Sequence, residues 1–142
     1  MKLVPFNMAA IMAVFFVMDA RASSLEFRQY SQRAYDVVST AGYQPEMIEA
    51  VRVEELYYKH ALLGRGHVIG RAVRYDDGHQ EILMREGMSE RQKLGILLHE
   101  VSHILAWTLH GTDVAPHGRD FNNICWKLVS AASLGRHFCR PD

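Results

Sequence analysis

The sequence predicts an α+β fold with an N-terminal helix, a small antiparallel sheet and two further helices. Three observations support this prediction. Apolar residues recur at helical spacing early in the chain, short glycine-bounded stretches follow, and a long apolar helical pattern begins after residue 89. The 142 residues suit a single domain, and 49% hydrophobic with 23% charged residues is ordinary for a globular protein.

Residues 1–22 contain the three parts of a secretory signal peptide. Lys2 gives a positive start, residues 3–18 are largely apolar, and an Ala-x-Ala sequence ends at Ala22. The apolar stretch is short for a membrane span, which needs roughly 20 apolar residues. We therefore expect residues 23–142 to form a secreted or periplasmic domain without a stable membrane span. The alternative is a cytoplasmic protein in which this stretch is a buried helix.

The net charge argues against a nucleic-acid partner, and the number of cysteines excludes a zinc ribbon. The net charge is zero, so the chain lacks the electrostatic footprint of a protein that binds nucleic acid, and we expect no such partner. The two cysteines, Cys125 and Cys139, cannot build a zinc ribbon, which needs four. They could form a disulfide in an exported protein or remain thiols in the cytosol, and the sequence leaves both states open.

Residues 24–40 form the first expected helix after the signal peptide. Apolar side chains recur there at near-helical spacing, and Ser23 or Ser24 can cap its start. Gly42 and Pro45 follow in the order typical of a helix C-terminus, so the helix should end near residue 40.

The middle of the chain predicts a short antiparallel sheet. Residues 48–58 alternate weakly between apolar and charged side chains, which favours a strand, although their glutamates would also suit a helix. Pieces of residues 68–75 and all of 80–84 are typical of strands, and Asp-Asp-Gly-His at 76–79 is a turn signal between them.

The strongest helical pattern begins after Ser89, which can form a capping box with Gln92. Apolar residues cover much of its circumference up to Gly111, so this helix should be buried on several sides. A last helix is predicted from about Arg119 to Ser133. Its expected inward positions are Phe121, Ile124, Cys125, Leu128 and Val129.

The sequence His-Glu-Val-Ser-His lies inside the long apolar helix. His99 and His103 are one turn apart on one face, so both imidazoles can reach one cation, at about 2.0–2.1 Å for zinc. Glu100 is adjacent to the first ligand, and in this motif the glutamate acts as the general base for the metal-bound water. Zinc lowers the pKa of that water towards about 7. These polar groups would be costly to bury unless paired or coordinated. The alternative is a pair of core histidines with hydrogen-bond partners.

A catalytic zinc site needs a third protein ligand and an open position for water. The metzincin pattern fails, because Leu109 stands where that pattern needs histidine and His110 comes one residue late. A downstream glutamate ligand also fails, because no glutamate follows Glu100. His117, in the loop beyond the helix, is therefore the expected third ligand, and Asp120 is the alternative.

The two motifs together resemble the SprT-like zinc metalloproteases. The His-Glu-x-x-His motif matches at 99–103, and His-Gly-x-x-Phe matches at 117–121. The resemblance covers roughly residues 24–133 and implies a zincin-like minimal metalloprotease domain. It implies one Zn2+ per chain, held by His99, His103 and His117, with Glu100 as the catalytic base. Many members carry a C-terminal zinc ribbon, which this chain cannot build.

The sequence therefore predicts an exported zinc endopeptidase that acts on a peptide or protein substrate. One alternative is a cytoplasmic SprT-like protease acting on DNA-bound proteins, against which the neutral charge and the export signal argue. Another is a non-catalytic zinc-binding interaction module. The retained Glu100 argues against it, because a structural zinc site is normally closed by a fourth protein ligand. The sequence leaves the oligomeric state open.

Overall fold

The computed structural model describes residues 29–55, 69–85 and 87–140, and the statements below concern these ranges. The predicted signal peptide and the predicted caps at Ser23 or Ser24 lie outside them. Within these ranges, no helix is both long and apolar enough to cross a bilayer.

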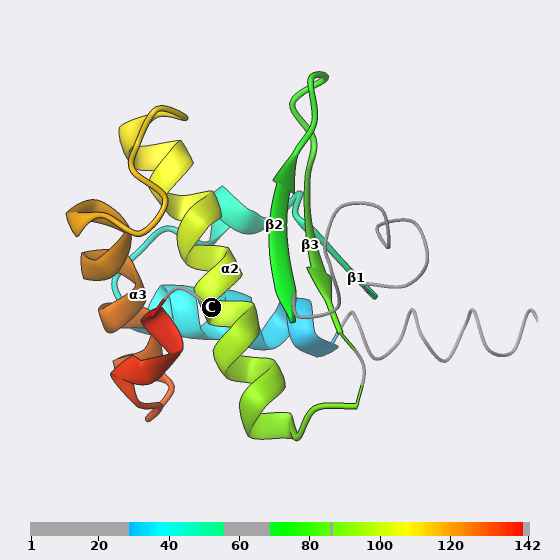
Figure 1. Ribbon diagram of the computed structural model, residues 1–142, viewed down its shortest axis with the longest axis vertical. Helices are drawn as coiled ribbons and strands as arrows, with labels where there is room; N and C mark the ends of the chain where they lie inside the picture. Colours follow the sequence, from blue (N-terminus) through cyan, green and yellow to red (C-terminus); the bar gives the residue numbers. More distant parts are fainter. Residues whose placement is uncertain (1–28, 56–68, 86, 141–142) are drawn as a thin grey trace, which may run out of the picture.

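The described chain contains three helices and a three-stranded sheet (Figure 1). A helix covers residues 29–40, and the 3-10 turn η1 (Pro45–Ile48) and the strands β1 (Arg52–Glu55), β2 (Gly70–Arg74) and β3 (Gln80–Met84) follow it. Helices α2 (Glu90–His110) and α3 (Arg119–Ala131) come next, and then the 3-10 turn η2 (Arg136–Cys139). The predicted α+β class is confirmed.

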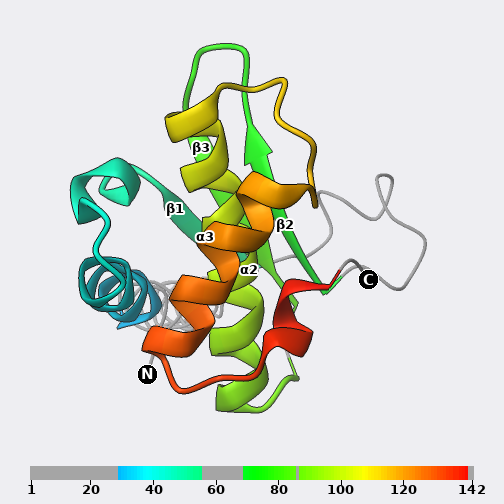
Figure 2. The ribbon, with the colours of Figure 1, turned by 90° about the vertical axis from the view of Figure 1, so that its left-hand side faces the viewer.

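Helix α2 lies at the centre of the molecule, with the sheet on one side and α3 on the other (Figures 1 and 2). It begins and ends where the sequence predicts. Ser89 and Gln92 form the expected capping box, and Gly111 ends the helix with a φ of 88°. The fully buried residues of α2 include Leu97, Leu98, Ile104 and Leu105. This helix therefore forms the middle of the core and positions whatever polar groups it carries.

The sheet is mixed, so the prediction of an antiparallel sheet is wrong. β2 and β3 form the predicted antiparallel pair, with Ala72 opposite Ile82, whereas β1 runs parallel to β3. The strand order is β1-β3-β2, which makes β3 the central strand and β2 an edge. The turn signal at 76–79 specifies only the β2–β3 pairing. The consecutive buried residues Ile82, Leu83 and Met84 explain why β3 is central, because a central strand is covered on both faces.

Helix α3 packs against α2 through the predicted inward positions, all of which are buried. It ends at Ala131, two residues before the predicted end at Ser133. Ser133 has a left-handed φ of 56°, which turns the chain away from the helix axis towards η2. Cys125 in α3 and Cys139 in η2 form a disulfide. Of the two states that the sequence leaves open, a disulfide or two thiols, the structure contains the disulfide.

Candidate metal centre

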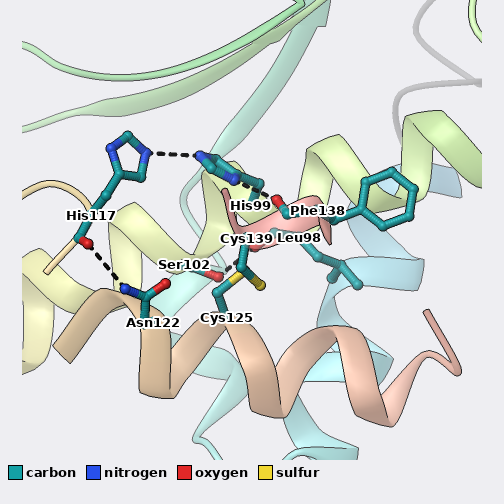
Figure 3. The surroundings of a disulfide bond; sticks show 8 residues. All are labelled: Leu98, His99, Ser102, His117, Asn122, Cys125, Phe138 and Cys139. Atoms are coloured by element: carbon teal, nitrogen blue, oxygen red, sulfur yellow. Dashed lines mark hydrogen bonds between the residues drawn. A yellow bond between two sulfur atoms is a disulfide. The ribbon is translucent and has the colours of Figure 1, made fainter. Parts of the chain in front are cut away.

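The three predicted histidine ligands come together from two segments of the chain. His99 and His103 lie on α2, and His117 lies in the loop between α2 and α3. Their candidate ligand atoms all lie within 4.8 Å of one another. Nε2 of His99 is 3.1 Å from Nε2 of His117 (Figure 3). The three histidines are therefore close enough to bind one metal ion.

The hydrogen bond of His99 uses Nδ1, so that Nε2 faces the other two histidines and can bind a metal. Nδ1 of His99 lies 2.6 Å from the carbonyl oxygen of Phe138 (Figure 3). A carbonyl can only accept, so Nδ1 carries the proton and Nε2 of the neutral ring keeps its lone pair. Two zinc-bound nitrogens in a tetrahedral site stand about 3.4 Å apart. The observed separation of 3.1 Å between the Nε2 atoms of His99 and His117 is close to that value.

Electrostatics keep His103 in the form that binds a metal. Burial, together with the charges that His99 and His117 can carry, lowers the pKa of His103 from 6.5 to about 3. The ring is therefore neutral at physiological pH, and metal ions bind neutral imidazole.

The ring of Phe121 contacts the rings of all three histidines. Its side chain is fully buried, and its ring is stacked on His103 with centroids 4.3 Å apart. It also meets the rings of His99 and His117 edge-on, at centroid distances of 5.0 and 4.9 Å. Phe121 comes from the first turns of α3, so the packing of α3 on α2 sets the positions of the ligands.

A tight turn presents His117 to the other two histidines. The N–H of Gly118 donates to the carbonyl of Ala115 at 3.1 Å, and a Cβ on Gly118 would lie 2.9 Å from the Cβ of Ala115. The side-chain amide of Asn122 donates to the carbonyl of His117 at 3.0 Å (Figure 3). Asn122 is a supporting residue that sequence reasoning missed, because a single asparagine at a helix start carries no specific signal.

Asp120, the alternative third ligand, does not belong to the cluster, and His110, which the sequence excludes by register, lies outside it as well. Among the described residues, the group of possible ligands contains His99, His103 and His117, without Asp120. His110 is the last residue of α2 and is exposed.

Glu100 lies against the edge strand of the sheet. Its side chain is 6% exposed, and Oε2 accepts a hydrogen bond of 2.7 Å from the N–H of Ala72 in β2. Gly70 permits this approach, because a Cβ there would lie 2.9 Å from Oε1 of Glu100 and 2.4 Å from Cγ2 of Ile96. The carboxylate is thus held between α2 and β2, one residue away from the first histidine.

A cavity of about 290 Å³ opens beside His99 and Glu100. Its apolar lining consists of Ile69, Met88, Ile96 and Phe138. Gln92, His137 and Arg140 supply the polar part of the lining. The site therefore combines a possible metal centre with a hollow large enough to receive a side chain.

No family model, curated protein or solved structure matches the chain. The resemblance to SprT-like proteases therefore remains a prediction from the two sequence motifs.

We expect the chain to bind about one divalent ion and to lose it when His117 is replaced. His117→Ala removes a ligand, so its metal affinity should fall by more than the roughly 10–100-fold that loss of an outer hydrogen bond costs. Competition with a chromogenic chelator measures the affinity. Asp120 lies three residues after His117, in the first turn of α3. Asp120→Ala is therefore the matched control and should bind the metal like the parent. If Asp120→Ala weakens binding as much as His117→Ala does, the ligand assignment is wrong.

The pKa of His103 predicts a pH dependence of the metal-free chain. Folding lowers its pKa from 6.5 to about 3. Between these pH values His103 is therefore protonated in the unfolded state and neutral in the folded state. The stability of the metal-free chain should therefore fall as the pH falls through this window. His103→Gln lacks this titration and should fall less steeply when melting temperatures are compared. Parallel curves for the two proteins would contradict the prediction.

Proposed function

We propose that this chain is a zincin-like, zinc-dependent endopeptidase. The observation that carries the proposal is the meeting of three imidazoles within 4.8 Å, next to the buried carboxylate of Glu100 on the same helix as two of them. Three protein ligands with one position left for solvent is the arrangement of catalytic zinc sites. Imidazole also suits copper, iron and nickel, so the choice of zinc rests on the motif.

In the proposed mechanism, a zinc ion at this site would supply Lewis acidity, which would lower the pKa of a bound water towards neutral pH and polarise the peptide carbonyl. Glu100 accepts the proton of the attacking water and later passes it to the amine of the leaving peptide. The hydrogen bond from Ala72 to Oε2 fixes the orientation of the carboxylate. His99, His103 and His117 hold the metal and take no part in proton transfer.

The edge of the sheet offers a place for a peptide substrate. At the two ends of β2, the carbonyl of Ile69 accepts a hydrogen bond from the N–H of Arg85, and the N–H of Tyr75 donates to the carbonyl of His79. Arg85 and His79 flank β3, so these groups point towards β3 and away from the free edge. The alternate residue Ala72 directs its N–H the other way, towards Glu100. An extended peptide can add to such an edge by main-chain hydrogen bonds. It would then run past Glu100 and the cavity of about 290 Å³ beside it.

The disulfide supports export. Disulfides form and persist in oxidising compartments, and they are rare in the cytosol. The Cys125–Cys139 bond therefore agrees with the signal peptide predicted for residues 1–22. Both features argue against the cytoplasmic alternative that acts on DNA-bound proteins.

The non-catalytic alternative is less well supported. A structural zinc site is closed by four protein ligands, whereas the cluster in the described ranges has three. Such a module would bind the metal without cleaving any unfolded protein.

Glu100→Gln tests the proposed mechanism. The substitution keeps the shape of the side chain but removes the base, so kcat/KM on an unfolded protein substrate should fall by about 10²–10⁴-fold while zinc remains bound. Glu90→Gln, at an exposed position on the same helix, is the matched control and should cleave like the parent. If Glu100→Gln with its full metal content cleaves as fast as the parent, Glu100 is not the base.

The N-terminus of the native protein tests the predicted export. Cleavage after Ala22 should leave Ser23 as the first residue, which N-terminal sequencing or intact-mass measurement would detect. An intact Met1, together with faster cleavage in the presence of DNA, would favour the cytoplasmic alternative.

A further inference from the structure

The turn η2 brings a segment far along the chain to the metal cluster. It follows α3, and it contacts both α3 and α2. Cys139 at its end is bonded to Cys125 in α3, with their Cα atoms 5.8 Å apart and both residues buried. Figure 3 shows that this disulfide and His99 lie on either side of the same short turn.

Phe138 connects η2 to the metal ligand in two ways. Its carbonyl oxygen lies 2.6 Å from Nδ1 of His99. Its ring lies so close to Gly95, one turn before His99 on α2, that a Cβ at Gly95 would come within 2.3 Å of Cδ1 and Cε1. The carbonyl reaches the histidine only while η2 stays seated on α2.

The hydrogen bonds of η2 itself are weak. It is a four-residue 3-10 turn, and the backbone hydrogen bonds from Phe138 to Gly135 and from Arg140 to His137 are both 3.3 Å long. Arg136 stacks over the ring of Trp126, which is 38% exposed. The disulfide is the covalent cross-link that joins the end of this turn to the side of α3.

We propose that the Cys125–Cys139 disulfide positions the metal ligand His99 through the Phe138 carbonyl, and so sets the metal affinity of the site. This inference rests on the metal centre of the proposed function. Without the bond, η2 can leave α2 and His99 loses the acceptor for Nδ1–H. The ring can then rotate or move its proton to Nε2, which removes the lone pair that faces the other histidines.

The proposal makes metal loading sensitive to the redox state of the compartment. A dithiol reductant would convert the Cys125–Cys139 bond into two thiols, with two electrons and two protons passing from the dithiol, which becomes a cyclic disulfide. The reduced chain would bind zinc weakly, and the oxidised chain would bind it tightly. The site would thus be completed in the oxidising compartment where the disulfide forms.

The test compares zinc affinities with and without the disulfide, using the full chain and a chromogenic chelator as competitor. Cys125→Ala/Cys139→Ala should lower the affinity for Zn2+ by about 10–100-fold, the usual effect of losing an outer hydrogen bond to a ligand. An unchanged affinity would overturn the proposal.

Two backgrounds separate positioning of His99 from general support of the fold. In His103→Ala, where His99 remains, removal of the disulfide should weaken zinc binding by a similar factor. In His99→Ala, which also keeps two histidines, removal should change nothing, because the residue that the disulfide acts on is absent. Equal losses in both backgrounds would show that the disulfide only stabilises the fold, and the proposal would fail.

Gly95→Ala provides the answer if the cysteine variant does not fold. It leaves the disulfide intact, but the new methyl group pushes against the Phe138 ring, so zinc affinity should fall. Adding Phe138→Ala removes the obstructing ring, keeps the backbone carbonyl and should restore the affinity. If Gly95→Ala binds zinc like the parent, η2 does not position His99.

The readout also separates this proposal from the proposed function. Zinc affinity that depends on both His99 and the disulfide, in a chain that cleaves no peptide, would keep the positioning role and reject the protease. Cleavage that persists with unchanged affinity after loss of the disulfide would do the reverse.

Discussion

The structure depends on satisfying polar groups that α2 carries into the core. An unpaired polar group in an apolar interior costs stability, and a buried charge costs more. His99 meets the carbonyl of Phe138, Glu100 meets the N–H of Ala72, and the hydroxyl of Ser102 donates to the carbonyl of Leu98 at 2.6 Å. These partners come from three different places: η2, the edge of the sheet, and α2 itself. Each of these elements therefore supplies a main-chain partner for a polar group that α2 carries.

Local signals in the sequence were sufficient for much of the fold and for the residues of the site. The capping box at Ser89, the stop at Gly111 and the hairpin turn at 76–79 act within a few residues, so each is readable without tertiary information. The spacing of His99 and His103 is likewise a property of one helix. His117 could be preferred because the position at Leu109 fails by residue type and His110 by register, although the sequence leaves Asp120 as an alternative ligand.

The remaining features depend on contacts between distant parts of the chain. β1 runs parallel to β3, a pairing decided by the burial of β3 rather than by any turn. The acceptors for His99 and Glu100 are both backbone groups, a carbonyl and an N–H, and every residue type supplies these. Gly70 is informative only once β2 is known to pass beside Glu100. A sequence pattern therefore identifies the candidate ligands more readily than the groups that orient them.

The place of η2 in the chain has a consequence for the order of events during synthesis. Chains emerge from the ribosome with the N-terminal end first. Helix α2 and the loop bearing His117 are therefore made before the residues that orient His99. A growing chain carries the three imidazoles for some time without the Phe138 carbonyl. Assembly of the complete set of contacts around His99 is thus delayed until translation has passed residue 139.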